Sequence, residues 1–147
     1  MNILTEAVAS PYAVIYPLPK DKALKILRDK KTVFVKYQTY EAIPQKLQNC
    51  KKIIFYISRA NKKIIGECDI NSIELLNLPE VLNTYQNDLF LTSDEMYEYS
   101  RGRIEKKMTV FKLNNIKFYG KEISYNHIVT MVGQYITKER YEELIKQ

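Results

Sequence analysis

The stretch 52–70, KIIFYISRANKKIIGECDI, decides the fold because two apolar runs flank a short polar bridge. Residues 52–58 and 63–70 are rich in β-branched and aromatic side chains, a composition that favours strands. The bridge, 59–62, has the length of an ordinary hairpin connection and carries positive charge. The sequence therefore predicts an antiparallel hairpin with a cationic tip.

Successive side chains of a strand point in opposite directions, so alternation assigns this hairpin two faces. Gly66 weakens a strand interior and therefore indicates a β-bulge or a close approach of another part of the chain. Glu67 and Asp69 share a face, where they could bind a cation or act as acid and base, although a solvated strand face is the favoured interpretation. The expected faces are Ile53, Phe55 and Ile57 against Ile54, Tyr56 and Ser58 in the first strand, and Ile64, Gly66, Cys68 and Ile70 against Ile65, Glu67 and Asp69 in the second.

Short strands and helices surround the hairpin, without the alternation of strand and helix that builds a parallel sheet. The asparagine pair 114–115 indicates a turn, and 72–85 is expected to be partly helical with a break near Pro79. We expect an α+β fold in which five to six short strands form a small β-barrel with flanking short helices, in one domain spanning 1–147. The other expected strands are 12–16, 32–37, 106–113 and 116–123, and the expected helices begin at Pro19, at Thr92 or Ser93, and at Thr137.

Composition excludes several classes of protein. The 147 residues are 46% hydrophobic and 27% charged, which is typical of a folded chain rather than a disordered one. No apolar run approaches the roughly 20 residues of a membrane span. Cys50 and Cys68 are far apart and have no histidine pair nearby, so we expect reduced thiols in a cytoplasmic protein, with neither a metal site nor a cofactor.

The net charge of +6 is unevenly distributed along the chain. Residues 46–63 contain six basic and no acidic residues, and residues 101–121 contain seven basic residues and one acidic residue. Residues 67–98, in contrast, contain eight acidic and no basic residues. Such segregation can build a one-signed face that attracts a polyanion. The alternatives are an uneven solvated surface or pairing of the opposite segments between subunits.

Signatures of standard catalytic sites are weak. His127 is the only histidine, and neither a nucleophile motif nor an acidic motif accompanies it, so we do not predict a hydrolase triad. The sequence also has no glycine-rich phosphate loop, which argues against nucleotide binding by a standard P-loop or dinucleotide fold.

Basic and aromatic residues recur together at strand ends and in the segment 97–107. Arginine and lysine neutralise phosphates, the planar guanidinium also stacks, and a tyrosine ring offers a surface to an unstacked base. The alternative is that the tyrosines pack in the interior and the lysines solubilise. The candidate nucleic-acid-binding residues are Lys36, Tyr37, Tyr56, Ser58, Arg59, Lys62, Arg101, Arg103, Lys106 and Lys107.

Three stretches together resemble the PUA-like superfamily, in particular the ASCH-type domains and a related uncharacterised archaeal family. They are YPLPKDKALKILRDKKTVFVKY (16–37), KKIIFYISRANKKIIGECDI (51–70) and YSRGRIEKKMTVFKLNNIKFYGKEI (99–123). The resemblance implies a pseudobarrel with a cleft that in relatives accepts RNA or a modified nucleobase. It also implies that the strand of Gly66 lies beside that cleft.

Some ASCH-type domains that this chain resembles are amidohydrolases acting on acylated cytidine. Lys31 falls on their lysine position, whereas their threonine position falls on Phe34, which has no hydroxyl. The alternative function is therefore an enzyme acting on a modified nucleoside or a small amide, with Lys31 or Lys36 paired with Glu67. The leading hypothesis is a module that binds RNA or a nucleotide-like anionic ligand in a basic cleft, in an oligomeric state that the sequence leaves open.

Overall fold

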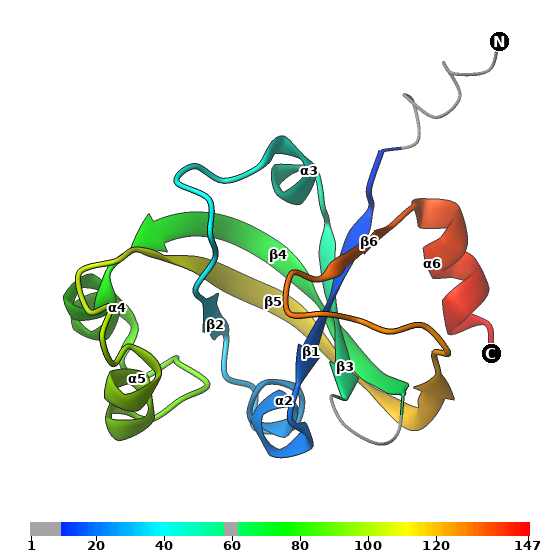
Figure 1. Cartoon of the computed structure of the whole chain (residues 1–147). Helices are drawn as coiled ribbons and strands as arrows, with labels where there is room; N and C mark the ends of the chain where they lie inside the picture. Colours follow the sequence, from blue (N-terminus) through cyan, green and yellow to red (C-terminus); the bar gives the residue numbers. More distant parts are fainter. Residues whose placement is uncertain (1–9, 58–61) are drawn as a thin grey trace, which may run out of the picture.

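The computed structural model describes residues 10–57 and 62–147, which form a twisted six-stranded sheet with helices on both faces (Figure 1). The predicted α+β class with five to six strands and flanking helices is confirmed. In chain order the elements are β1 (Ala13–Leu18), α2 (Lys20–Leu27), β2 (Val33–Lys36), α3 (Gln45–Gln48), β3 (Lys52–Ile57), β4 (Lys63–Leu76), α4 (Leu78–Tyr85), α5 (Ser93–Tyr99), β5 (Met108–Ser124), β6 (Gln134–Ile136) and α6 (Lys138–Ile145).

The strands lie in the order β2-β5-β4-β3-β1-β6 across the sheet. β1 and β3 are parallel, and the other neighbours are antiparallel. Within the described residues β2 and β6 are separate edges, so the sheet is open and the predicted barrel is not confirmed. The long strands β4 and β5 instead curve across the molecule (Figure 1), and three register shifts in their pairing mark local bends.

The predicted hairpin is confirmed as the antiparallel pair β3 and β4. Its tip, 58–61, lies outside the described residues. A bulge in this pairing inserts one residue into β4, which reverses the predicted faces at that point. Ile64 therefore packs with Tyr56 on one face of the sheet, while Ile65 packs with Phe55 on the other.

The expected helix within 72–85 is shorter than predicted, because β4 continues to Leu76. These residues pair with β5, and the cross-strand contacts outweigh the local preference for helix. α4 begins only at Leu78, where the Asn77 side chain accepts a hydrogen bond from the Glu80 backbone in a capping box. Pro79 lies in the first turn, a position that proline tolerates, and so it does not break the helix.

The turn expected at 114–115 is also wrong, because β5 runs unbroken from Met108 to Ser124. Asn115 instead adopts a left-handed conformation, with φ of 48°, inside the strand. Asparagine tolerates this conformation better than most residues. The Asn115 side chain donates a 2.7 Å hydrogen bond to the Asp69 carboxylate on β4, which ties the irregular position to the neighbouring strand.

The predicted helix starts are confirmed. The side chains of Thr92 and Thr137 accept hydrogen bonds from the backbone N–H groups of Glu95 and Arg140, as N-cap residues do. Pro19, in an extended conformation, directly precedes α2. The helices of the described part are short, and none combines the length and apolar character needed to cross a membrane.

Buried side chains form two clusters, one on each face of the sheet. The first core lies under α2, α4 and α5 and contains a group of aromatic rings around Phe34. The second core lies under α6, which contributes Tyr141 and Leu144. Alternation along β1 and β3 supplies both cores: Val14, Tyr16, Ile53 and Phe55 face the first, and Ala13, Ile15, Ile54 and Tyr56 face the second.

Gly66 lies at the close approach that the sequence indicates. A Cβ at this position would lie 2.6 Å from both Leu27 methyl carbons and 2.7 Å from the Lys117 carbonyl oxygen. Because the β5 backbone must shift to make room, we expect Gly66→Ala to lower the free energy of unfolding by about 1–3 kcal/mol. Gly120→Ala is the control, since among the described residues no atom lies within 4 Å of its Cβ position. Denaturant unfolding measures both variants, and equal effects would contradict the expectation.

Candidate functional site

Lys36 ends the edge strand β2 and is buried, with only 5% of its surface exposed. Its Nζ donates a 2.7 Å hydrogen bond to the Met131 carbonyl oxygen and lies 4.7 Å from the centre of the Tyr16 ring. Burial lowers the pKa of this amine from 10.5 to about 8, because water solvates the charged form poorly at this position. A buried amine with a lowered pKa is typical of a functional site.

A cavity of about 480 Å³ lies beside Lys36 and is called the Lys36 cavity below. The Lys36 amine, the Lys22–Glu95 ion pair and Glu98 are its charged groups. Its volume falls within the range of about 300–1,000 Å³ that is usual for small-ligand sites. The rest of its lining is mainly apolar and comes from Pro17, Leu18, Pro19, Phe34, Val35, Phe90, Leu91, Tyr99 and Met131.

A second cavity, of about 240 Å³, is lined by four tyrosines and is called the tyrosine cavity below. Met131 lines both cavities, and Tyr16, whose ring lies under the Lys36 amine, lines the second. Lys36 and Met131 thus form the partition between the two cavities. The tyrosine cavity is lined by Tyr16, Tyr37, Gln38, Thr39, Tyr40, Pro44, Met131, Val132 and Tyr135.

Arg103 and Tyr37, both predicted site residues, lie together at one edge of these cavities. The guanidinium carbon of Arg103 lies 4.0 Å from the centre of the Tyr37 ring, and the Arg103 side chain donates hydrogen bonds to the Tyr99 carbonyl oxygen. Tyr37 donates a 2.9 Å hydrogen bond to the Ser100 hydroxyl. Arg103 therefore orders the end of α5, and its stacked guanidinium remains next to a tyrosine that lines a cavity.

The remaining basic candidates of this segment are exposed. Arg101 forms a 2.5 Å ion pair with Glu98, a residue of the Lys36 cavity, while Lys106 and Lys107 follow in the connection to β5. Exposed lysines near an apolar cavity are suited to contact phosphates of a bound strand. The structure thus brings together Lys36, Tyr37, Arg101 and Arg103 around the two cavities.

Other predicted residues lie elsewhere. Tyr56 is buried in the second core, where its ring is 6.3 Å from that of Tyr125, so it offers no face to a ligand. Lys62 is exposed at the start of β4, and Ser58 and Arg59 lie outside the described residues. Lys31 precedes β2, at the end of the strand opposite Lys36, and donates a hydrogen bond to the Asn87 carbonyl oxygen.

Glu67 is a buried carboxylate on the face of the second core, with 4% of its surface exposed. It accepts hydrogen bonds of 2.8 Å from the hydroxyls of Tyr119 and Tyr141, and the Lys52 ammonium lies 3.0 Å from it. Lys52 also lies 2.6 Å from Asp69 and so occupies the place between the two carboxylates that a metal cation would take. The favoured interpretation of a solvated strand face is therefore wrong for Glu67, because the tyrosines and Lys52 compensate for its lost hydration.

The structure pairs Glu67 with Lys52 rather than with Lys36, which ends β2, or with Lys31, which precedes β2. The carboxylates that line the same cavity as Lys36 are Glu95 and Glu98. A catalytic role for Lys31, Lys36 or Glu67 stays a prediction. Within residues 10–57 and 62–147, no group of three or more His, Cys, Asp or Glu side chains is arranged to hold a metal ion.

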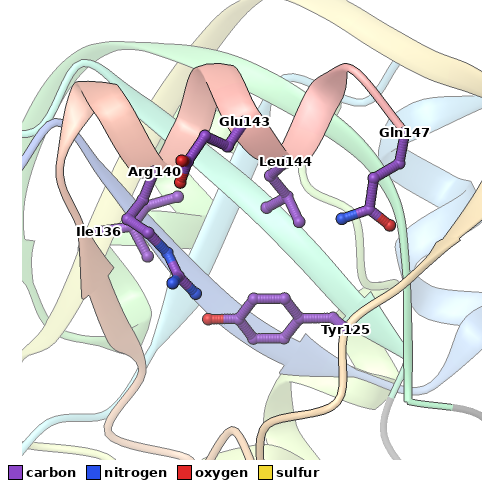
Figure 2. A pocket seen from close by; sticks show the side chains of 6 residues that line it. All are labelled: Tyr125, Ile136, Arg140, Glu143, Leu144 and Gln147. Carbon is purple, nitrogen blue, oxygen red and sulfur yellow. The ribbon is translucent and has the colours of Figure 1, made fainter.

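A smaller pocket of about 170 Å³ lies between α6 and the segment that follows β5. Figure 2 shows the Arg140 side chain extending from α6 toward the hydroxyl of Tyr125, with Leu144 beside the ring. The Tyr125 hydroxyl already donates to Gln134, and the centre of the tilted His127 ring lies 4.9 Å from the centre of the Tyr125 ring. This pocket is smaller than both the Lys36 cavity and the tyrosine cavity.

Sequence reasoning missed the other walls of the tyrosine cavity. Tyr40 follows the predicted strand at 32–37, and Tyr135 lies in the short strand β6, which carries no strong strand signal. Met131 and Val132 belong to the mostly apolar stretch 128–132, IVTMV, of a connection between strands, and this is the one local signal that could have drawn notice. Lys52 lies in a predicted strand, and no sequence pattern indicated that it pairs with Glu67.

Comparison with solved structures shows that this chain shares its fold with an ASCH protein, in agreement with the resemblance to ASCH-type domains seen in the sequence. The chain is similar to an ASCH protein from Zymomonas mobilis, with a TM-score of 0.74 and 20% identity over 91% of this chain and 94% of that one. A serine-to-alanine mutant of that protein matches with a TM-score of 0.78 and 20% identity over 95% and 98%. The N-terminal domain of McrB from Staphylothermus marinus matches with a TM-score of 0.61 and 21% identity over 94% of both chains.

The chain belongs to the family described as domain of unknown function DUF365, whose model matches residues 11–138. It is also 33% identical over 106 residues to an uncharacterised protein of Methanocaldococcus jannaschii, an alignment that covers 65% of this chain and 98% of that protein. The predicted relation to an uncharacterised archaeal family is thereby confirmed.

Proposed function

We propose that this protein binds nucleic acid, with RNA favoured over DNA, and that one nucleobase occupies the Lys36 cavity. The observation that carries the proposal is an apolar, base-sized cavity that contains one buried amine, Lys36, at the edge of a PUA-like sheet. The resemblance to PUA-like proteins implies the same class of ligand. Arg101 and Arg103, which contact Glu98 and Tyr99 of this cavity, contact the phosphates together with the exposed Lys106 and Lys107 that follow in the chain.

The lining of the Lys36 cavity suits an unstacked base. Phe34, Phe90 and Tyr99 provide aromatic surface, and base–aromatic stacking contributes about 1–3 kcal/mol per base in single-strand binding. The Lys36 ammonium can donate to a base carbonyl or ring nitrogen, and the Glu98 carboxylate can accept from an exocyclic amine. Donor and acceptor groups in an otherwise apolar cavity give such a site its selectivity among bases.

The alternative function, hydrolysis of an amide on a modified nucleoside, is favoured by one observation. A lysine whose pKa is lowered to about 8 can act as a base or a nucleophile near neutral pH. In that case Glu95 or Glu98 would be the carboxylate partner, since these residues share the cavity with Lys36. Turnover of an N-acylated cytidine by the wild-type protein would favour this function over binding alone.

Salt dependence tests the nucleic-acid proposal. Single-strand binding loses affinity with a slope of about 0.7 in log K per log salt for each phosphate neutralised. We expect the double variant Lys106→Ser, Lys107→Ser to weaken binding of a short single-stranded RNA and, by removing two phosphate contacts, to reduce this slope by about 1.4. Fluorescence anisotropy across a salt series provides the measurement.

The charge-matched control is Lys117→Ser with Lys121→Ser, which removes two exposed lysines from β5, away from both cavities. This control should keep the wild-type slope. Undetectable RNA binding by the wild-type protein at low salt would contradict the proposed function. If both double variants reduce the salt slope equally, Lys106 and Lys107 have no specific contact with the RNA.

A further inference from the structure

The turn 130–133, which leads into β6, is held firmly against the sheet. The backbone N–H of Gly133 donates a 2.9 Å hydrogen bond to the Thr130 carbonyl oxygen, and the Lys36 amine holds the Met131 carbonyl oxygen at 2.7 Å. Gly133 has a φ of +91°, and a Cβ there would lie 2.6 Å from a ring carbon of Tyr16. The turn backbone therefore packs directly on the Tyr16 ring, a contact that only glycine permits.

Two apolar side chains project from this anchored turn. Met131 exposes 63% of its surface and Val132 exposes 75%. Isolated exposed apolar residues are common on proteins. These two, however, lie at the partition described above, because Met131 lines both cavities and Val132 lines the tyrosine cavity. The turn is thus an apolar ridge between two cavities with aromatic walls.

The tyrosine cavity has the chemistry of a base-binding position. The partly exposed rings of Tyr37, Tyr40 and Tyr135 offer stacking surface, and Gln38 and Thr39 supply hydrogen-bonding groups beside them. The Lys46 ammonium lies 5.9 Å from the centre of the Tyr135 ring, and the Arg103 guanidinium stacks on Tyr37. Cations beside aromatic rings are the combination that holds the phosphates and bases of a single strand.

We infer that the ligand is a single-stranded nucleic acid held through two adjacent nucleotides, which the turn 130–133 splays apart. One base enters the Lys36 cavity, and its neighbour stacks in the tyrosine cavity. Met131 and Val132 lie between the two bases, as apolar side chains do where proteins separate stacked bases. The inference rests on the proposed function and specifies its ligand as an unpaired step of two nucleotides, because paired bases cannot reach both cavities.

Calorimetric titration at fixed low salt tests this inference. The ligands are a nucleoside monophosphate, a dinucleotide, and the same dinucleotide lacking its second base, each in RNA and DNA form. The abasic compound carries the same phosphates as the dinucleotide, so any difference in affinity comes from the second base. We expect the complete dinucleotide to bind about 10-fold more tightly than the abasic one, the effect of stacking one base.

Variants test whether the difference in affinity between the complete and the abasic dinucleotide arises in the tyrosine cavity. Tyr135→Ala should abolish the 10-fold gain while leaving the affinity for the monophosphate unchanged, and Tyr135→Phe should retain the gain because the ring remains. Val132→Ser should reduce the gain. Ile128→Ser is its matched control, since Ile128 is another branched residue of the same connection, is 79% exposed and lines neither cavity.

The outcomes separate this inference from the proposed function. If the monophosphate binds and the complete and abasic dinucleotides bind equally, the two-nucleotide site is overturned and the single-base site stands. A short duplex and its matching single strand are titrated in the same way. If the duplex binds more tightly than the single strand, the two-nucleotide site is likewise overturned. If no nucleotide or strand binds at all, both proposals are overturned.

Discussion

Glu67→Ala is expected to lower the free energy of unfolding by about 3–5 kcal/mol, the cost of breaking a buried ion pair by removing one partner. The substitution leaves the hydroxyls of Tyr119 and Tyr141 without the carboxylate that accepts their hydrogen bonds. It also leaves Lys52 with Asp69 as its one remaining carboxylate partner. Since Tyr141 belongs to α6, the loss acts on the attachment of that helix to the sheet.

Two variants separate the charge of Glu67 from its shape. Glu67→Gln keeps an oxygen acceptor for the tyrosines and should cost less than Glu67→Ala. Asp69→Ala removes the more exposed partner of Lys52 and should cost about 1 kcal/mol or less, as partly exposed pairs do. Denaturant unfolding gives the three free energies, and amide exchange in α6 reports its attachment. If Glu67→Ala is as stable as the wild type, the contacts of Glu67 with Lys52 and the two tyrosines make no net contribution to the free energy of unfolding.

Lys36→Met is expected to have opposite effects on stability and on binding. The fall in the Lys36 pKa from 10.5 to about 8 corresponds to about 3 kcal/mol of unfavourable burial of the charged amine. Methionine fills a similar volume without that charge but loses the hydrogen bond to the Met131 carbonyl. The net expectation is a gain in stability of about 1–2 kcal/mol at pH 7, which identifies Lys36 as a residue kept for function at the expense of stability.

The stability gain depends on pH in a defined direction. Below pH 8 the amine is protonated in both the folded and unfolded chains, so the full cost of burying its charge is present. Between pH 8 and 10.5 the folded chain loses this proton while the unfolded chain keeps it, so the wild-type protein becomes more stable as pH rises. The stability difference between Lys36→Met and wild type should therefore shrink from pH 8 toward pH 10.

Nucleic-acid binding should respond in the opposite way. Because a charged hydrogen bond contributes about 1.5–3 kcal/mol, Lys36→Met should weaken RNA binding roughly 10- to 100-fold. Wild-type affinity should hold below pH 8 and fall above it, as the Lys36 amine loses the charge that the ligand requires. Lys31→Met is the matched control, because it makes the same change just before β2 begins, at a lysine that does not line the Lys36 cavity. A stabilised Lys36→Met variant that binds RNA normally would remove Lys36 from the binding site.

The two predictions follow from a contrast between buried charges. Glu67 is surrounded by groups that satisfy it, namely two hydroxyls and an ammonium, so the fold depends on it. Lys36 has a carbonyl and a ring face but no carboxylate among its described contacts, so no opposite charge compensates for the burial of its amine there. The amino-acid sequence does not distinguish these two environments.

Local sequence signals predicted much of the fold. The hairpin β3–β4, the strand β2 and the helix caps Thr92 and Thr137 all depend on interactions between residues a few positions apart. The errors occurred where a neighbouring strand overrides the local preference. Residues 71–76 became strand, and the asparagines at 114–115 remained within β5, because pairing between β4 and β5 satisfies their backbone groups.

The sequence by itself determined the β3–β4 hairpin, the strand β2, the helix starts, the likeness to the ASCH-type fold and the presence of basic segments. Only the tertiary structure decided that Lys36 is buried, that it lies between two cavities, and that Met131 and Tyr135 share a site with Tyr37 and Tyr40. The reason is that these residues are about a hundred positions apart in the chain. Their proximity depends on the order of strands across the sheet and on where the segment before β6 folds back, which no local pattern of side chains encodes.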